Sequence, residues 1–203
     1  MLFFICIGCK NVTEKETEQI QIAVDSTGLQ IKMVEKETAD LNLTSFLDNP
    51  VDLQEFKKKK GSNVTTTVTN GMKYHLHPKI NDSIFYSYNF ITENIGPKGI
   101  NEIVVFKYGE NRHTYEDETE ILIELRIFNE DADLGKANLV GLARKELEAE
   151  FGSDYRILNN RMMYSNKNKL VILELDDSKV ISYKYLKLAT ENVDSDLIQQ
   201  LME

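Results

Sequence analysis

Short runs of alternating apolar and polar residues, separated by polar turns, set the strongest limit on what this chain can fold into. The clearest run covers residues 118–128, where Ile121, Ile123, Leu125 and Ile127 would share one face of a strand. Comparable runs at residues 83–91 and 102–108, and four more between residues 155 and 188, predict further strands. The sequence therefore predicts a fold rich in β-structure.

Asn70-Gly71 predicts a β-hairpin in the first half of the chain. It stands between β-rich runs at residues 64–69 and 72–77, and both turn residues accept a positive φ. An earlier hairpin is expected where alternating runs flank the polar turn at residues 25–28.

Three short helices are expected between and after the strands. Asn49 would cap the first, Pro50 would begin it, and Gly61 would end it after a run of four lysines. The second covers residues 141–151 and the third residues 195–202. Because helices lie between runs of sequential strands, we expect an α+β fold of antiparallel β meanders, with helices packed mainly on one face.

The composition fits an ordinary globular protein and disfavours several ligands. The chain has 203 residues and a net charge of -9, and nucleic acid binding requires a basic surface, so we expect no nucleic acid partner. No apolar run is long enough to cross a bilayer as a helix. The only cysteines are Cys6 and Cys9, so the rest of the chain has no disulfide framework.

The opening segment, MLFFICIGCK, has three interpretations. Cys6 and Cys9 could form a redox pair, or residues 2–7 could form a buried first strand. The interpretation that we prefer is an export signal, in which the apolar residues 2–7 precede the small residue Gly8 and a cysteine at the cleavage point. Residues 10–19 are almost wholly polar, as a solvated tether would be.

Ile7-Gly8-Cys9 resembles the end of the lipobox of bacterial lipoproteins. Two features depart from that pattern: the segment has no basic start, and Cys6 stands where an aliphatic residue is usual. The resemblance implies that Cys9 is lipidated and anchors the exported protein to a membrane of the cell envelope. We therefore expect a signal segment at residues 1–8, a tether at 9–19 and a globular α+β region at 20–203.

A second resemblance rests on a pattern of helix, hairpin strands and acidic turn. The matching positions are Gly141, Leu147, Phe151-Gly152 and the turn Asp176-Asp177-Ser178-Lys179-Val180. The pattern resembles the small outer-membrane assembly lipoproteins of the SmpA/OmlA (BamE) type and the β-lactamase inhibitor protein fold, although Ala143 stands where Ser or Thr is usual. The resemblance implies an α+β binding or assembly module.

The first half of the chain repeats part of this pattern. A short helix ending at Gly61 precedes the predicted Asn70-Gly71 hairpin, much as the second helix precedes the later strands. Two tandem helix-plus-meander units would divide the globular region into residues 20–134 and 135–203.

Two groups of side chains are candidates for binding. His75 and His77 would share one face of a strand and could ligate a metal, although zinc needs one or two more ligands, and the alternative is a solvated strand face. Tyr86, Tyr88 and Phe90 form an aromatic row, which is interpreted either as core packing or as a binding patch.

No residue is assigned a catalytic role, because the sequence has no Gly-x-Ser-x-Gly elbow, no His-Glu-x-x-His and no complete phosphate loop. We expect no cofactor. The leading hypothesis is a non-enzymatic, lipid-anchored envelope protein that binds a protein partner. The alternatives are an inhibitor or immunity-type protein whose acid-rich residues 110–133 bind a basic partner, and a hydrolase without a recognisable motif.

Overall fold

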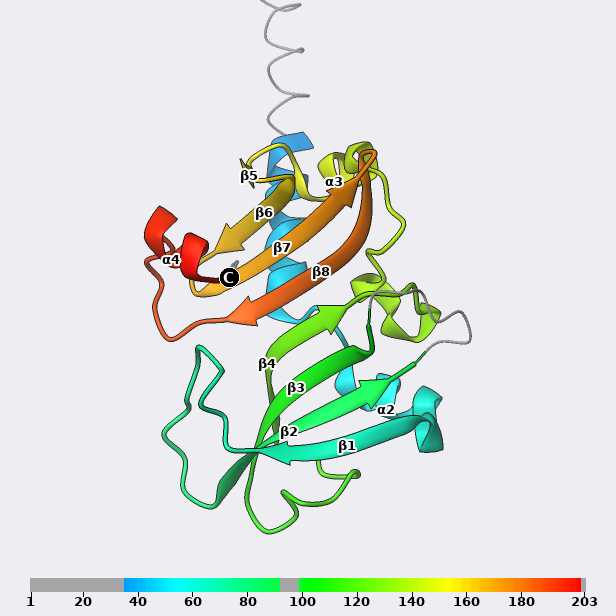
Figure 1. Cartoon of the computed structure of the whole chain (residues 1–203), viewed down its shortest axis with the longest axis vertical. Coiled ribbons are helices and arrows are strands. Elements are labelled where there is room, and N and C mark those ends of the chain that lie inside the picture. The colour runs from blue at the N-terminus through cyan, green and yellow to red at the C-terminus, as the bar shows by residue number, and fades with distance from the viewer. Residues whose placement is uncertain (1–34, 92–98, 202–203) are drawn as a thin grey trace, which may run out of the picture. The chain divides into compact units, whose positions relative to one another are not determined.

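The structure, a computed structural model, describes residues 35–91 and 99–201, and the described residues from Ala39 onward belong to one unit (Figure 1). The signal segment, tether and first hairpin predicted from the sequence lie outside the described residues. The unit is built on an antiparallel sheet of eight strands in the order β1-β2-β3-β4-β8-β7-β6-β5. The expected α+β class with antiparallel meanders is confirmed.

Two meanders that follow each other in the chain make up the sheet. The strands are β1 (Val64–Thr69), β2 (Ser83–Phe90), β3 (Asn101–Tyr108), β4 (Glu120–Ile127), β5 (Arg156–Leu158), β6 (Arg161–Asn166), β7 (Lys169–Asp176) and β8 (Lys179–Lys187). β4 pairs with β8 and so joins the two meanders into one continuous sheet. The two units predicted at residues 20–134 and 135–203 thus share a single sheet in the described part of the chain.

Most of the helices pack on one face of the sheet. The elements are a helix that ends at residue 48, α2 (Leu53–Lys60), η1 (Gly61–Asn63), η2 (Ala132–Ala137), α3 (Arg144–Phe151) and α4 (Ser195–Leu201). Phe56 of α2 and Leu147 of α3 are fully buried in the main core, together with Tyr88 and Tyr185 of the sheet. The ring of Phe56 also meets the ring of Phe90 edge-on, with centroids 4.9 Å apart. These contacts stabilise both meanders from the same side.

Among the described residues, the other face of the sheet is covered at its two ends only. α4 packs Ile198 and Leu201 on an apolar patch formed mainly by β7 and β8. At the other end, the loop over residues 70–82 packs Tyr74 against Phe85 and Phe106. A polar strip remains between these two covers.

The predicted hairpin at Asn70-Gly71 is wrong. β1 pairs with β2, with Thr69 opposite Phe85, and residues 72–77 belong to a loop. Gly71 (φ 76°) begins a turn that is closed by the Tyr74 N–H donating to the Gly71 carbonyl, 2.9 Å away. A Cβ on Gly71 would overlap the ring of Phe85, so glycine here permits a close tertiary contact.

A β-bulge breaks the alternation that the sequence predicted for residues 118–128. The register between β3 and β4 shifts after Val104. Ile121 and Ile123 consequently pack in the cluster beneath the loop, whereas Leu125 and Ile127 pack in the main core beneath the helices. These four residues do not share one face, because a bulge adds a residue to one strand and changes which face the next side chains take.

The helix ends partly follow the prediction. Asp52, not Asn49, caps α2: its carboxylate accepts hydrogen bonds from the amides of Gln54 and Glu55, at 3.1 and 3.0 Å. Gly61 follows the last residue of α2, as expected. α3 begins at Arg144, three residues later than predicted, and ends before Gly152.

A group of buried charges connects α2, β3 and β4. The Lys57 ammonium donates to the Glu120 carboxylate at 3.0 Å, and the Lys107 ammonium lies 3.4 Å from the same oxygen, which also accepts a hydrogen bond from the Tyr88 hydroxyl. The side chains of Lys57, Lys107 and Glu120 are 5%, 0% and 1% exposed. Burial lowers the pKa of Lys107, and Glu120 partly opposes that effect. Glu120 therefore compensates two buried cations.

Replacing Glu120 by Gln should lower the free energy of unfolding by about 3–5 kcal/mol, because two buried ammonium groups lose their nearest carboxylate and only Lys107 keeps another, Asp117, at 3.9 Å. Urea denaturation followed by circular dichroism measures this loss. The matched control is Glu55→Gln, which breaks an exposed ion pair with Lys59 (2.8 Å) and should cost less than about 0.5 kcal/mol. Equal losses in the two variants would refute the role given to Glu120.

Candidate functional site

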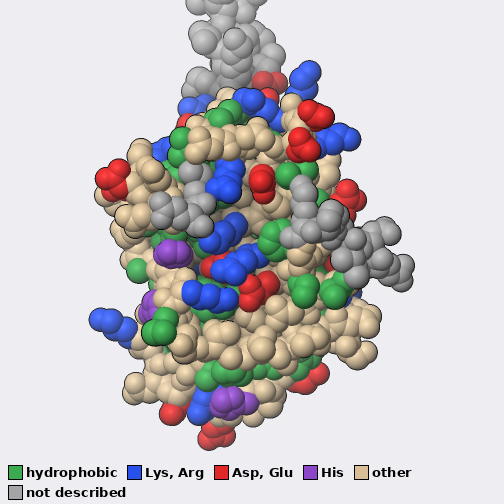
Figure 2. All heavy atoms as spheres, viewed as in Figure 1, with side chains coloured by type: hydrophobic (Ala, Val, Ile, Leu, Met, Phe, Trp, Pro, Cys, Tyr) green, Lys and Arg blue, Asp and Glu red, His purple; other side chains and the backbone are tan. Residues whose placement is uncertain are grey.

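The polar strip between the two apolar covers is the candidate site. Figure 2 shows basic and acidic side chains gathered in the middle of this face. We call this strip the open face, and its charged and hydroxyl residues are Glu102 of β3, Glu124 and Arg126 of β4, Arg161 of β6, Glu174 of β7, and Ser182 and Lys184 of β8.

Strand geometry brings these side chains to one face. Successive side chains of a strand point to opposite faces, so Arg126 lies opposite to Leu125, which is fully buried in the main core. In β8, Lys184 likewise alternates with Tyr183 and Tyr185, which pack in the same core. The polar positions of otherwise apolar strands thus form the site.

Two carboxylates hold Arg126 in place. Its guanidinium lies 3.3 Å from Glu102 and also forms an ion pair with Glu124. Glu102 in turn accepts a hydrogen bond of 2.9 Å from the Ser87 hydroxyl. Burial alone would lower the pKa of Arg126, but the two carboxylates raise it above its ordinary value. Arg126 is therefore a fixed and permanently charged donor.

The pairing of β4 with β8 places Arg126 directly opposite Lys184. Like charges in this arrangement repel each other and destabilise a sheet. Glu124, whose side chain is 1% exposed, lies beside both: one of its oxygens pairs with Arg126 and is 3.9 Å from the Lys184 ammonium. Burial lowers the pKa of Lys184, Glu124 opposes this shift, and the neighbouring cations Arg126, Arg161 and Lys73 lower the pKa further.

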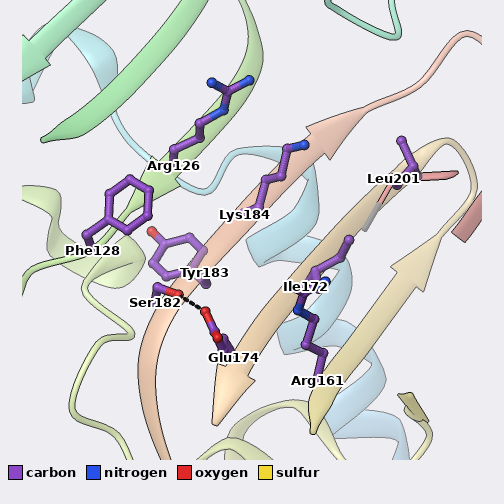
Figure 3. Close-up of a pocket in the computed structure, with 9 residues that line it drawn as sticks. All are labelled: Arg126, Phe128, Arg161, Ile172, Glu174, Ser182, Tyr183, Lys184 and Leu201. Carbon is purple, nitrogen blue, oxygen red and sulfur yellow. Dashed lines mark hydrogen bonds between the residues drawn. The ribbon is translucent and has the colours of Figure 1, made fainter. Parts of the chain in front are cut away.

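A small cavity of ≈ 220 Å³ opens among these residues (Figure 3). Its lining consists of Arg126, Phe128, Arg161, Ile172, Glu174, Ser182, Tyr183, Lys184 and Leu201. The Ser182 hydroxyl donates to the Glu174 carboxylate at 2.8 Å. The cavity is smaller than typical sites for drug-sized ligands, which occupy about 300–1,000 Å³, so it suits a single small chemical group.

The aromatic row lies on the opposite side of the sheet from the open face. Tyr86, Tyr88 and Phe90 are 5%, 0% and 1% exposed and belong to the main core. The rings of Tyr86 and Tyr88 meet edge-on, with centroids 5.3 Å apart. Their location matches the core-packing interpretation of this row.

The two candidate metal-binding histidines lie in the loop over residues 70–82, not on a strand. The His77 ring nitrogen is 2.9 Å from the Tyr74 carbonyl oxygen, and the His75 carbonyl accepts a hydrogen bond from the Ala189 amide. Within residues 35–91 and 99–201, no three His, Cys, Asp or Glu side chains form a group that could hold a metal ion. Burial and then Lys184 lower the pKa of His75.

Several carboxylates of the acid-rich residues 110–133 form ion pairs within the fold. Glu120 compensates buried lysines, Glu124 pairs with Arg126, and Asp131 forms an ion pair of 2.6 Å with Lys60. These acids therefore compensate basic side chains within the fold. Cys9, the predicted lipidation site, lies outside the described residues.

Sequence reasoning did not identify Arg126, Arg161 and Lys184 as members of one site. They lie on three different strands, and no motif connects them. The only feature of the sequence that indicates these residues is a basic side chain within each of three otherwise apolar strands. That pattern is common on solvated sheet faces, so it does not specify a site.

Comparison with known proteins gives no relative of this chain: no protein-family model, no curated protein and no solved structure matches it. In the described residues, no helix has the length and apolar character needed to cross a membrane. The site must therefore be interpreted from its own chemistry. The open face offers guanidinium and ammonium donors beside carboxylate acceptors, which together can form charge-assisted hydrogen bonds with a ligand.

Proposed function

We propose that the protein is a non-enzymatic binding or assembly module of the bacterial cell envelope, anchored by a lipid at Cys9, that binds a protein partner at its open face. The observation that carries the binding role is the partly buried set of charges between the two apolar covers. The anchor rests on the sequence alone, in which Ile7-Gly8-Cys9 resembles the end of a lipobox.

The energetics of the open face support a binding role. Apolar residues of similar size often stabilise a fold as well as buried ion pairs do, or better. Here the sheet instead retains a like-charge pair, Arg126 and Lys184, at a cost in stability. Residues that lower stability are typical of functional surfaces, where binding requirements take precedence over folding. The central position of this pair makes it the expected contact point for a partner.

The lipid anchor can be tested by replacing each cysteine in turn. Cys9→Ser should abolish incorporation of labelled fatty acid and release the protein from membranes, because stable anchoring requires about two acyl chains at ~0.8 kcal/mol per buried methylene. Cys6→Ser is the matched control and should behave as the unmodified protein. Membrane fractionation of bacterial cells expressing each variant measures the outcome. Undiminished labelling and sedimentation of Cys9→Ser would show that no lipid is attached there.

Partner binding at the open face can be tested by photo-crosslinking in cells that express the chain. A photoreactive residue in place of Glu174, which is exposed on the open face, should give a discrete crosslinked protein. The matched control replaces Lys145, an exposed residue of α3, and should not give this product. Crosslinks of equal yield at both positions, or none at Glu174, would contradict a partner at this face.

A further inference from the structure

Three basic side chains meet at the small cavity of the open face. Arg126, Arg161 and Lys184 contribute to its lining, whereas Glu174 is the one carboxylate among its lining residues. Figure 3 shows Arg126 and Lys184 extending in the same direction from the neighbouring strands β4 and β8. The excess of cationic donors around a cavity of ≈ 220 Å³ favours an anionic group as its ligand.

The charges around Lys184 define how much negative charge the site can accept. The cations are Lys73, Arg126, Arg161 and Lys184, and the carboxylates are Glu102, Glu124 and Glu174. His75 has a pKa below its ordinary value of 6.5, so its ring is neutral at pH 7. Lys73 does not line the cavity, whereas Arg126, Arg161 and Lys184 do. Of the three carboxylates, only Glu174 lies in the lining, while Glu102 and Glu124 form ion pairs with Arg126.

We propose that this cavity binds a single carboxylate group, held by Arg126, Arg161 and Lys184. The inference rests on the proposed binding function, because it names the chemical group that the open face recognises. A guanidinium matches the two oxygens of a carboxylate, and the Lys184 ammonium supplies a third donor. The bound group also relieves the repulsion between Arg126 and Lys184.

The charge balance favours a carboxylate over a phosphate. A carboxylate brings only one negative charge to a site that already holds the carboxylates of Glu124 and Glu174. A phosphate monoester carries about 1.5–2 negative charges at pH 7 and would face the carboxylates of Glu124 and Glu174. Like-charge repulsion should therefore make phosphate the weaker ligand.

The test is an NMR titration of the isotope-labelled full chain with sodium acetate at pH 7 and constant ionic strength, with sodium chloride as the reference salt. Acetate should produce saturable shifts in the side-chain signals of Arg126 and Arg161. It should also raise the pKa of Lys184, because a bound anion stabilises the charged ammonium. Inorganic phosphate should bind more weakly than acetate.

Two lysines of β8 provide matched variants. Lys184→Met should weaken acetate binding about ten-fold, the effect of losing one charge-assisted hydrogen bond. Lys187, whose pKa is also lowered by burial, lies near Asp48 and Lys169 and does not line the cavity, so Lys187→Met should leave affinity within about two-fold. The inference is overturned by equal effects of both variants, by acetate shifts no larger than those of chloride, or by tighter binding of phosphate.

Crosslinking from position 174 in the Lys184→Met background identifies the source of the carboxylate. Loss of the crosslink would assign the group to the bound protein, whereas a retained crosslink with weakened acetate binding would assign it to a free small molecule. Either result supports a carboxylate site. Failure of acetate binding with crosslinking intact would refute only this inference, and acetate binding without any crosslinked partner would refute only the proposed function.

Discussion

The antiparallel pairing of β4 with β8 is the interaction on which the rest of the structure depends. It joins two meanders, which follow each other in the chain, into one sheet of eight strands. Because the sheet is continuous, α2 and α3 pack on the same face and share one core. The same pairing sets Arg126 beside Lys184 and so creates the centre of the open face.

β4 compensates charges on both sides of the sheet. At its start, Glu120 balances the buried ammonium groups of Lys57 and Lys107, which connects β4 to α2 and β3. Further along, Glu124 contacts the cations of the open face. Glu120 is buried with its partners, whereas Glu124 contacts Arg126 and Lys184, which line the cavity of the open face. One strand therefore links the stability of the core to the chemistry of the proposed binding surface.

The sequence predicted the strands well because alternation and turn residues are local signals. It failed at Asn70-Gly71, where glycine is required by a tertiary contact with Phe85, and within β4, where a bulge breaks the face assignment of the isoleucines. The open face could not be predicted, because it depends on the register between two strands that are distant in the chain. Arg126 and Lys184 become neighbours only through that register.

Cross-strand contacts between β4 and β8 test the central claim most directly. In a two-dimensional NOE spectrum of the protein, Hα–Hα contacts between the two strands should match the register in which Leu125 faces Tyr185 and Arg126 faces Lys184. In an antiparallel pair of strands, such contacts are close at every second pair of facing residues. Contacts in this register would establish one continuous sheet and the charge pair at its centre. Contacts within each meander but none between β4 and β8 would show two separate sheets and contradict the account.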